Sequence, residues 1–192
     1  MIISFLKVLF FEYIQNIFAI ISIILAARNW KESKKVIGLF FAIVGNSLSF
    51  LCIALTEPIL LKSTTLTSDP SLEGNLVMII LTGSIIFAAF AVLFTAYVNQ
   101  KWSNKRLDII IGVFIAVCLS ILQSNPSDPN SSVARFISHT IAFAISFPIT
   151  IILVRDAILI KSIKNAMIKG VIATLVMSVI IVIVDYGSFL IK

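Results

Sequence analysis

Long apolar runs separated by short polar segments dominate the chain. Runs of about 18 or more apolar residues are typical of membrane-spanning helices, whereas a transmembrane barrel would show alternating segments of about ten residues, which are absent. The pattern therefore predicts an all-α integral membrane protein, a bundle of six transmembrane helices joined by short loops. We expect the spans at residues 5–27, 36–60, 75–98, 107–123, 133–155 and 168–190.

Composition supports this class. Of the 192 residues, 59% are hydrophobic and only 12% are charged, whereas a soluble domain carries about 25% charged residues. The mean hydropathy is +1.10. Too few polar side chains are present to cover a water-soluble surface, so residues 1–192 are predicted to form a single polytopic transmembrane domain. No basic segment precedes the first apolar run, so we interpret that run as a retained span rather than a cleaved signal peptide.

The distribution of charge predicts the orientation. The net charge is +6, and the basic residues gather in the loops after the first, third and fifth spans, while the other two loops are polar and slightly acidic. Basic loops stay in the cytoplasm, so both termini are predicted outside, in a cytoplasmic or plasma membrane. No nucleic-acid partner is expected. The predicted cytoplasmic basic residues are Arg28, Lys31, Lys34, Lys35, Lys101, Lys105, Arg106, Lys161 and Lys164.

Small residues at helical spacing indicate where the spans pack. Helices in lipid associate through close packing of small residues and a few hydrogen bonds between helices. The second and third spans each carry such a stripe, and an amide beside the first stripe is expected to hydrogen-bond to a neighbouring helix. The predicted packing residues are Gly38, Ala42, Gly45 and Asn46 in the second span and Ser84 and Ala88 in the third.

Three ionisable residues inside spans are functional candidates, because charged groups in a membrane are costly. Glu12, His139 (the only histidine) and Asp185 all fall in the outer half of their spans; His139 lies about six residues, or ~9 Å, from the outer end of its helix. We predict a polar pocket formed by these residues with Asn16 and Ser146. Alternatively, His139 and Asp185 form a static pair near the headgroups, with Glu12 reaching water.

No catalytic motif accompanies these residues. The chain has no HExxH, no P-loop and no nucleophile motif of the GxSG type. Its two cysteines, Cys52 and Cys118, lie inside apolar runs without metal-ligand spacing. No enzymatic activity, metal or cofactor is therefore predicted.

Three functions fit the pattern. The first is a solute or ion recognition or transport component; size and short loops resemble, in architecture alone, the membrane-embedded substrate-binding subunits of vitamin transporters, although none of their motifs is present. The second is a non-catalytic accessory subunit of a larger membrane complex. The third is a sensory or signalling module that acts through the basic cytoplasmic loops. Besides the lipid bilayer, we expect a membrane or cytoplasmic protein partner, or a second copy of the chain, and we favour the first function.

Overall fold

A computed structural model describes residues 2–61, 85, 88–100, 103–123 and 133–190. Every regular element among these residues is a helix, so the all-α prediction is confirmed for the described part of the chain. The elements are α1 (Ile2–Lys31), α2 (Lys35–Leu61), a shorter helix at Ala88–Val98, α4 (Lys105–Gln123), α5 (Val133–Leu159) and α6 (Ile163–Leu190).

Two short turns produce antiparallel helix pairs. Between α1 and α2, Ser33 adopts a left-handed conformation with φ of 65°, and the Lys34 amide donates to the Asn29 carbonyl at 2.8 Å. A left-handed residue just after a helix is a common way to end it. Between α5 and α6, the Ser162 hydroxyl accepts a hydrogen bond from the Asn165 amide at 3.4 Å, as an N-cap does.

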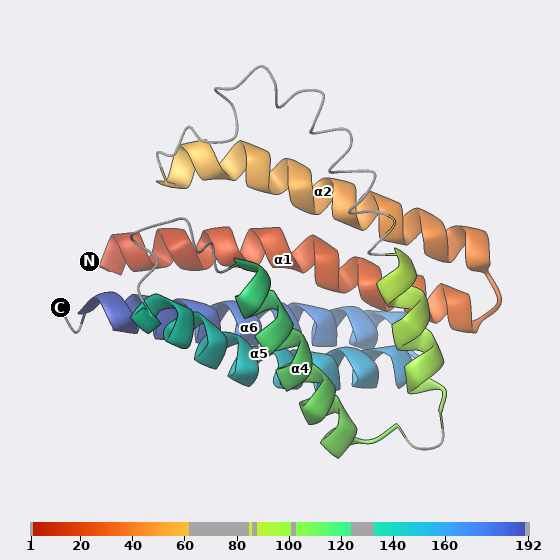
Figure 1. Ribbon diagram of the computed structural model, residues 1–192. Coiled ribbons are helices and arrows are strands. Elements are labelled where there is room, and N and C mark those ends of the chain that lie inside the picture. Colours follow the sequence, from red (N-terminus) through yellow and green to blue (C-terminus); the bar gives the residue numbers. More distant parts are fainter. Residues whose placement is uncertain (1, 62–84, 86–87, 101–102, 124–132, 191–192) are drawn as a thin grey trace.

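Helices α1, α5 and α6 form the centre of the bundle (Figure 1). Helix α2 packs on α1, and α4 crosses α5 at an angle. The first turn of α1 and the last turn of α6 lie at the same end (Figure 1). We call the opposite end, where α1 and α5 end and α2 and α6 begin, the basic end, because Arg28, Lys31, Lys161 and Lys164 lie there.

Small side chains fill the contacts between the central helices. One buried cluster joins α1, α5, α6 and the helix at Ala88–Val98, and alanines from α1, α5 and α6 in it are fully buried. These alanines let neighbouring backbones approach closely, as small residues do between membrane helices. The cluster consists of Ile20, Ile24, Ala27, Phe94, Val98, Ile151, Val154, Ala157, Ile158, Ala166, Ala173, Met177 and Ile181.

Large apolar side chains cover much of the outer surface. Val36 on α2 is 82% exposed and Phe114 on α4 is 68% exposed, with many neighbours of the same kind. Soluble monomers rarely expose apolar patches of such extent. Three described helices are long and apolar enough to cross a membrane, namely Phe5–Lys31, Thr140–Leu159 and Ile163–Val184.

The small-residue stripe of α2 faces α1. A Cβ atom added to Gly38 would lie 2.9 Å from the Ala26 carbonyl oxygen, and one added to Gly45 would overlap the side chain of Ser22. Ala42, between these glycines, is buried with Ala26. The stripe therefore permits close contact between the two helices.

The other packing residues contribute less or lie elsewhere. Ala88, with Ala91, belongs to the same buried cluster as Ala42, so the helix at Ala88–Val98 contacts both α1 and α2. Asn46 is half-buried on α2. Ser84 lies outside the described residues.

Replacing Gly45 by alanine is expected to lower the free energy of unfolding by about 1–3 kcal/mol, because the added methyl group forces α2 away from Ser22 on α1. Gly170→Ala on α6 is the matched control. Its added Cβ would meet only Ile24 and Ile21 side-chain atoms, the nearest being Ile24 Cδ1 at 2.9 Å, the movable end of a side chain. Thermal unfolding in detergent compares the two variants, and equal destabilisation would contradict the tight α1–α2 contact.

Candidate functional site

Glu12 and Asn16 lie one turn apart on α1, and both are half-buried. The Asn16 Nδ2 atom donates to the Glu12 carbonyl oxygen at 2.7 Å and lies 3.5 Å from its Oε2 atom. The Asn16 amide therefore contacts the Glu12 carboxylate within one helix. This pair places one carboxylate and one amide in the half of the bundle opposite the basic end.

His139 and Asp185 occupy helical positions in α5 and α6. Their side chains lie outside the described residues, so their pairing stays a prediction.

Ser146, the fifth predicted pocket residue, is fully buried on α5, and its hydroxyl has no hydrogen-bond partner among the described residues. Ser178 on α6 is also fully buried with an unpartnered hydroxyl. A buried hydroxyl without a partner costs roughly 1–3 kcal/mol. Two such groups in the central helices are therefore unusual, since buried polar atoms are nearly always hydrogen-bonded.

Helix geometry places these two serines at a similar level. Ser146 lies 13 residues before the end of α5 and Ser178 lies 15 residues after the start of α6, which corresponds to about 20 Å and about 22 Å from the turn that joins the helices. Gly170 of α6 faces Ile21 and Ile24 of α1. Ser178 lies eight residues beyond Gly170 on α6. Because α1 runs in the opposite direction, the same distance along α1 leads from Ile24 back to Asn16, so Ser178 and Asn16 lie at a similar level.

Two threonines one turn closer to the basic end differ from these serines. The Thr150 hydroxyl donates to the Ser146 carbonyl oxygen at 2.8 Å, and the Thr174 hydroxyl donates to the Gly170 carbonyl oxygen at 2.9 Å. Both hydroxyls are thus satisfied within their own helices, as is common for threonine in membrane helices. The unpartnered hydroxyls of Ser146 and Ser178 therefore lie one turn farther from the basic end than these satisfied threonines; Asp108 Oδ2 and Arg155 Nε are the other buried polar atoms without a hydrogen bond among the described residues.

Pro148 lies inside α5, between Ser146 and Thr150. Proline has no amide hydrogen, so the helix cannot form its usual bond to the carbonyl of Ala144. A Cβ atom added to Gly112 of α4 would lie 2.6 Å from the Pro148 Cα and N atoms. The proline is therefore packed directly against the α4 backbone, next to the serine level.

A buried ion pair joins α4 to α5 near the basic end. The Arg155 Nη1 atom lies 2.6 Å from Asp108 Oδ2; the Asp108 side chain is fully buried and that of Arg155 is 9% exposed. The Tyr97 hydroxyl donates to Asp108 Oδ1 at 2.6 Å. The carboxylate is thus held from two helices other than its own. We call Tyr97, Asp108 and Arg155 the buried ionic cluster.

A second, more exposed ion pair lies beside this cluster. Asp156 Oδ1 lies 3.6 Å from Arg155 Nη2, and Asp156 Oδ2 accepts a hydrogen bond from Lys169 Nζ at 3.4 Å. Both partners of the Lys169 pair are about one-third exposed. The pair connects α5 to α6 across their shared turn, and such exposed pairs contribute little to stability.

Arg28 of α1 caps the end of α5. Its guanidinium donates to the carbonyl oxygens of Ala157 at 3.1 Å, of Lys161 at 2.8 Å and also of Ile160. The last carbonyls of a helix have no partner within the helix, and a positive charge there interacts favourably with the helix dipole. The guanidinium carries five N–H donors in a planar fork, which lets it reach several separated acceptors at once.

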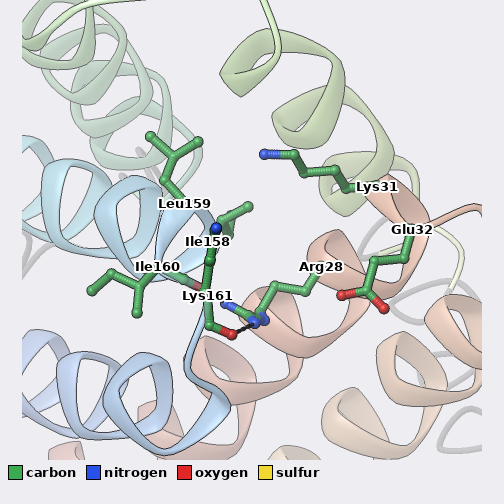
Figure 2. A pocket seen from close by; sticks show the side chains of 7 residues that line it. All are labelled: Arg28, Lys31, Glu32, Ile158, Leu159, Ile160 and Lys161. Carbon is green, nitrogen blue, oxygen red and sulfur yellow. Dashed lines mark hydrogen bonds between the residues drawn. The ribbon is translucent and has the colours of Figure 1, made fainter.

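Arg28 also lines a pocket of about 430 Å³ at the basic end (Figure 2). Figure 2 shows Arg28 and Lys31 extending from α1 toward the end of α5, with Arg28 hydrogen-bonded to the Lys161 carbonyl. We call this cavity the basic pocket; its lining is Arg28, Lys31, Glu32, Ile158, Leu159, Ile160 and Lys161.

The other predicted basic residues within the described part of the chain lie at the starts of helices or in the turn between α1 and α2. Lys34 forms an ion pair with Glu32 at 2.9 Å, and its hydrogen bond lowers the pKa of the Glu32 carboxyl. Lys35 begins α2, and Lys105 and Arg106 begin α4. Lys164 is exposed in the first turn of α6. Lys101 lies outside the described residues.

Sequence reasoning missed the buried ionic cluster. Asp108 and Arg155 both fall inside predicted spans, 107–123 and 133–155, but at the ends that adjoin basic loops. Charges at such ends commonly reach the headgroup region. A carboxylate and a guanidinium at the same predicted depth were nevertheless a signal for pairing, because charges inside a bundle pair with one another.

Among the described residues, no three histidine, cysteine or acidic side chains come together as metal ligands would.

Comparison with protein-family models, with curated proteins and with solved structures gives no match.

Proposed function

We propose that the chain is a multi-pass membrane protein that recognises a small polar solute or a cation between α1, α5 and α6, as a binding or transport component. The observation that carries this proposal is the pair of fully buried, unpartnered hydroxyls of Ser146 and Ser178. A solute with hydrogen-bonding groups, or a cation that prefers oxygen ligands, satisfies such hydroxyls when it binds.

Three features support membrane insertion. The apolar outer surface, the three long apolar helices and the six apolar runs of the sequence all fit a protein surrounded by lipid. The proposed topology has six spans, with the basic end in the cytoplasm and both termini outside. In this topology the level of Ser146 and Ser178 lies well inside the bilayer, and Glu12, His139 and Asp185 lie between that level and the outer surface.

The residues at these positions are suited to a polar ligand. Glu12 supplies a negative charge and Asn16 holds it from the next turn. His139 is the only residue of the chain with an ordinary pKa near neutral pH. Asp185 supplies a second carboxylate on α6. A carboxylate, a titratable ring and unpartnered hydroxyls at neighbouring depths are the groups that transporters use to bind ions and solutes.

The proposal predicts ligand-dependent stabilisation that depends on the titratable residues. The purified full chain is heated in detergent with a panel of alkali cations, amino acids and small polar vitamins. A ligand present at 100 times its Kd raises the free energy of unfolding by about 2.7 kcal/mol. His139→Ala and Asp185→Asn are each expected to abolish this shift while leaving the protein folded.

Ser120→Ala is the matched control, because Ser120 is buried on α4 and its hydroxyl is satisfied by the Ala116 carbonyl oxygen at 2.9 Å. This variant should keep the wild-type ligand response. If the His139 and Asp185 variants also keep it, the pocket does not exist as proposed.

The accessory-subunit alternative is supported by a different observation. The buried ionic cluster joins α4 to α5 and to the helix at Ala88–Val98, and the Arg28 cap joins α1 to α5. Such connections between helices suit a static scaffold. A scaffold predicts no response to any solute in the panel and co-purification with other membrane subunits.

A further inference from the structure

We propose that the basic pocket binds the phosphate group of an anionic phospholipid from the leaflet at the basic end. Its lining combines three positive side chains with one negative side chain, and it has a volume of about 430 Å³. Basic pockets between helices on the cytoplasmic side of a membrane are a recurring way to bind anionic lipid headgroups. The site is distinct from the Ser146 and Ser178 level.

Two of the four charged side chains have other roles. The Arg28 guanidinium donates to carbonyl oxygens of the last turn of α5 and of the turn that follows it. These hydrogen bonds fix its position, and its positive charge still acts on the pocket. Glu32 is paired with Lys34 at 2.9 Å, so the negative charge of the lining is already compensated.

Lys31 and Lys161 are the groups available to a ligand. Both are exposed, and neither ammonium makes a hydrogen bond or ion pair within the part of the chain that the structure describes. Lys31 extends from α1 toward the end of α5 (Figure 2). Lys161, two residues after the last residue of α5, lines the same pocket. A phosphate group between them receives two charge-assisted hydrogen bonds beside a fixed guanidinium, which is a favourable arrangement for an anion.

The position and the apolar part of the lining favour a lipid over a soluble anion. The pocket lies where the apolar helices Phe5–Lys31 and Thr140–Leu159 both end, which is headgroup depth in the proposed topology. Ile158, Leu159 and Ile160 supply apolar surface beside the charges. The phosphate of a lipid contacts the charged side chains, and its glycerol and acyl region contacts the apolar side chains. Inorganic phosphate contacts only the charged side chains.

Native mass spectrometry of the full chain in neutral detergent tests this site. The probes are phosphatidylglycerol, phosphatidylcholine and inorganic phosphate, each titrated separately. We expect phosphatidylglycerol to bind in preference to both others. Lys31→Gln with Lys161→Gln should weaken its binding roughly 30-fold, since each lysine near an anionic headgroup contributes a factor of about five.

Two variants complete the test. Lys105→Gln with Lys164→Gln removes the same charge from exposed positions outside the pocket and should leave binding unchanged. Lys31→Arg with Lys161→Arg keeps the charge and should keep binding. Equal loss in the two glutamine pairs, or equal binding of phosphatidylcholine, would overturn the assignment; inorganic phosphate binding as tightly as phosphatidylglycerol would show a soluble anion to be the ligand. The lipid site rests on the membrane insertion in the proposed function. The solute response is measured in the absence of anionic lipid, so loss of lipid binding and loss of the solute response can be told apart.

Discussion

Asp108→Ala is expected to lower the free energy of unfolding by about 3–5 kcal/mol, the usual cost of removing one partner of a buried ion pair. The substitution leaves the Arg155 guanidinium, whose side chain is 9% exposed, without its carboxylate. It also removes the acceptor of the Tyr97 hydroxyl. Reversible unfolding of the full chain in mixed detergent micelles measures the loss.

A double-mutant cycle separates the ion pair from simple packing. Arg155→Met alone should also destabilise strongly, because it leaves a fully buried carboxylate unpaired. The double variant removes both charges and should cost clearly less than the two single losses together. Glu32→Gln, in an exposed pair, should have no measurable effect. Strict additivity of the two core substitutions would show that Asp108 and Arg155 are not coupled.

Arg28→Met is expected to lower the free energy of unfolding by about 3 kcal/mol. One carbonyl oxygen of the last turn of α5 and two of the turn that follows lose their donors, together with the positive charge that offsets the helix dipole. Amide hydrogen exchange in α5 should rise first near Ile158 and Ile160, because the uncapped end frays before the helix centre.

Two controls locate this effect. Lys31→Met, one turn farther along α1 and exposed, should leave unfolding unchanged in the absence of anionic lipid. Arg28→Lys should fall between wild type and Arg28→Met, because lysine keeps the positive charge but carries all its donors on one nitrogen rather than on a planar fork. Exchange that increases evenly along α5 would contradict a capping role.

The apolar runs predicted the helical class, and two of the described helices extend past the predicted spans. The predicted fifth span ended at residue 155, whereas α5 continues to Leu159. Likewise, the predicted sixth span began at residue 168, whereas α6 begins at Ile163. In both cases the hydropathy falls toward the charged segment that joins the helices, but the backbone stays helical beyond that fall.

Only those features of the candidate site that lie within one helix could be predicted from the sequence. Glu12 and Asn16 are four residues apart, a spacing that places side chains side by side on a helix. The depth of Ser146 follows from counting residues along its span. Contacts between helices, such as Asp108 with Arg155 and Arg28 with the end of α5, depend on how α1, α4 and α5 are rotated and shifted against one another. The sequence pattern does not specify that register.

Native mass spectrometry of the tagged full chain, gently extracted from its host membrane, tests whether the chain itself binds a small polar ligand inside a membrane bundle. We expect a monomer or homo-oligomer that carries a bound small molecule, which Asp185→Asn and His139→Ala both lose. A chain that carries no small molecule and leaves the membrane with other subunits at fixed stoichiometry would show that the chain is not a solute-binding protein by itself.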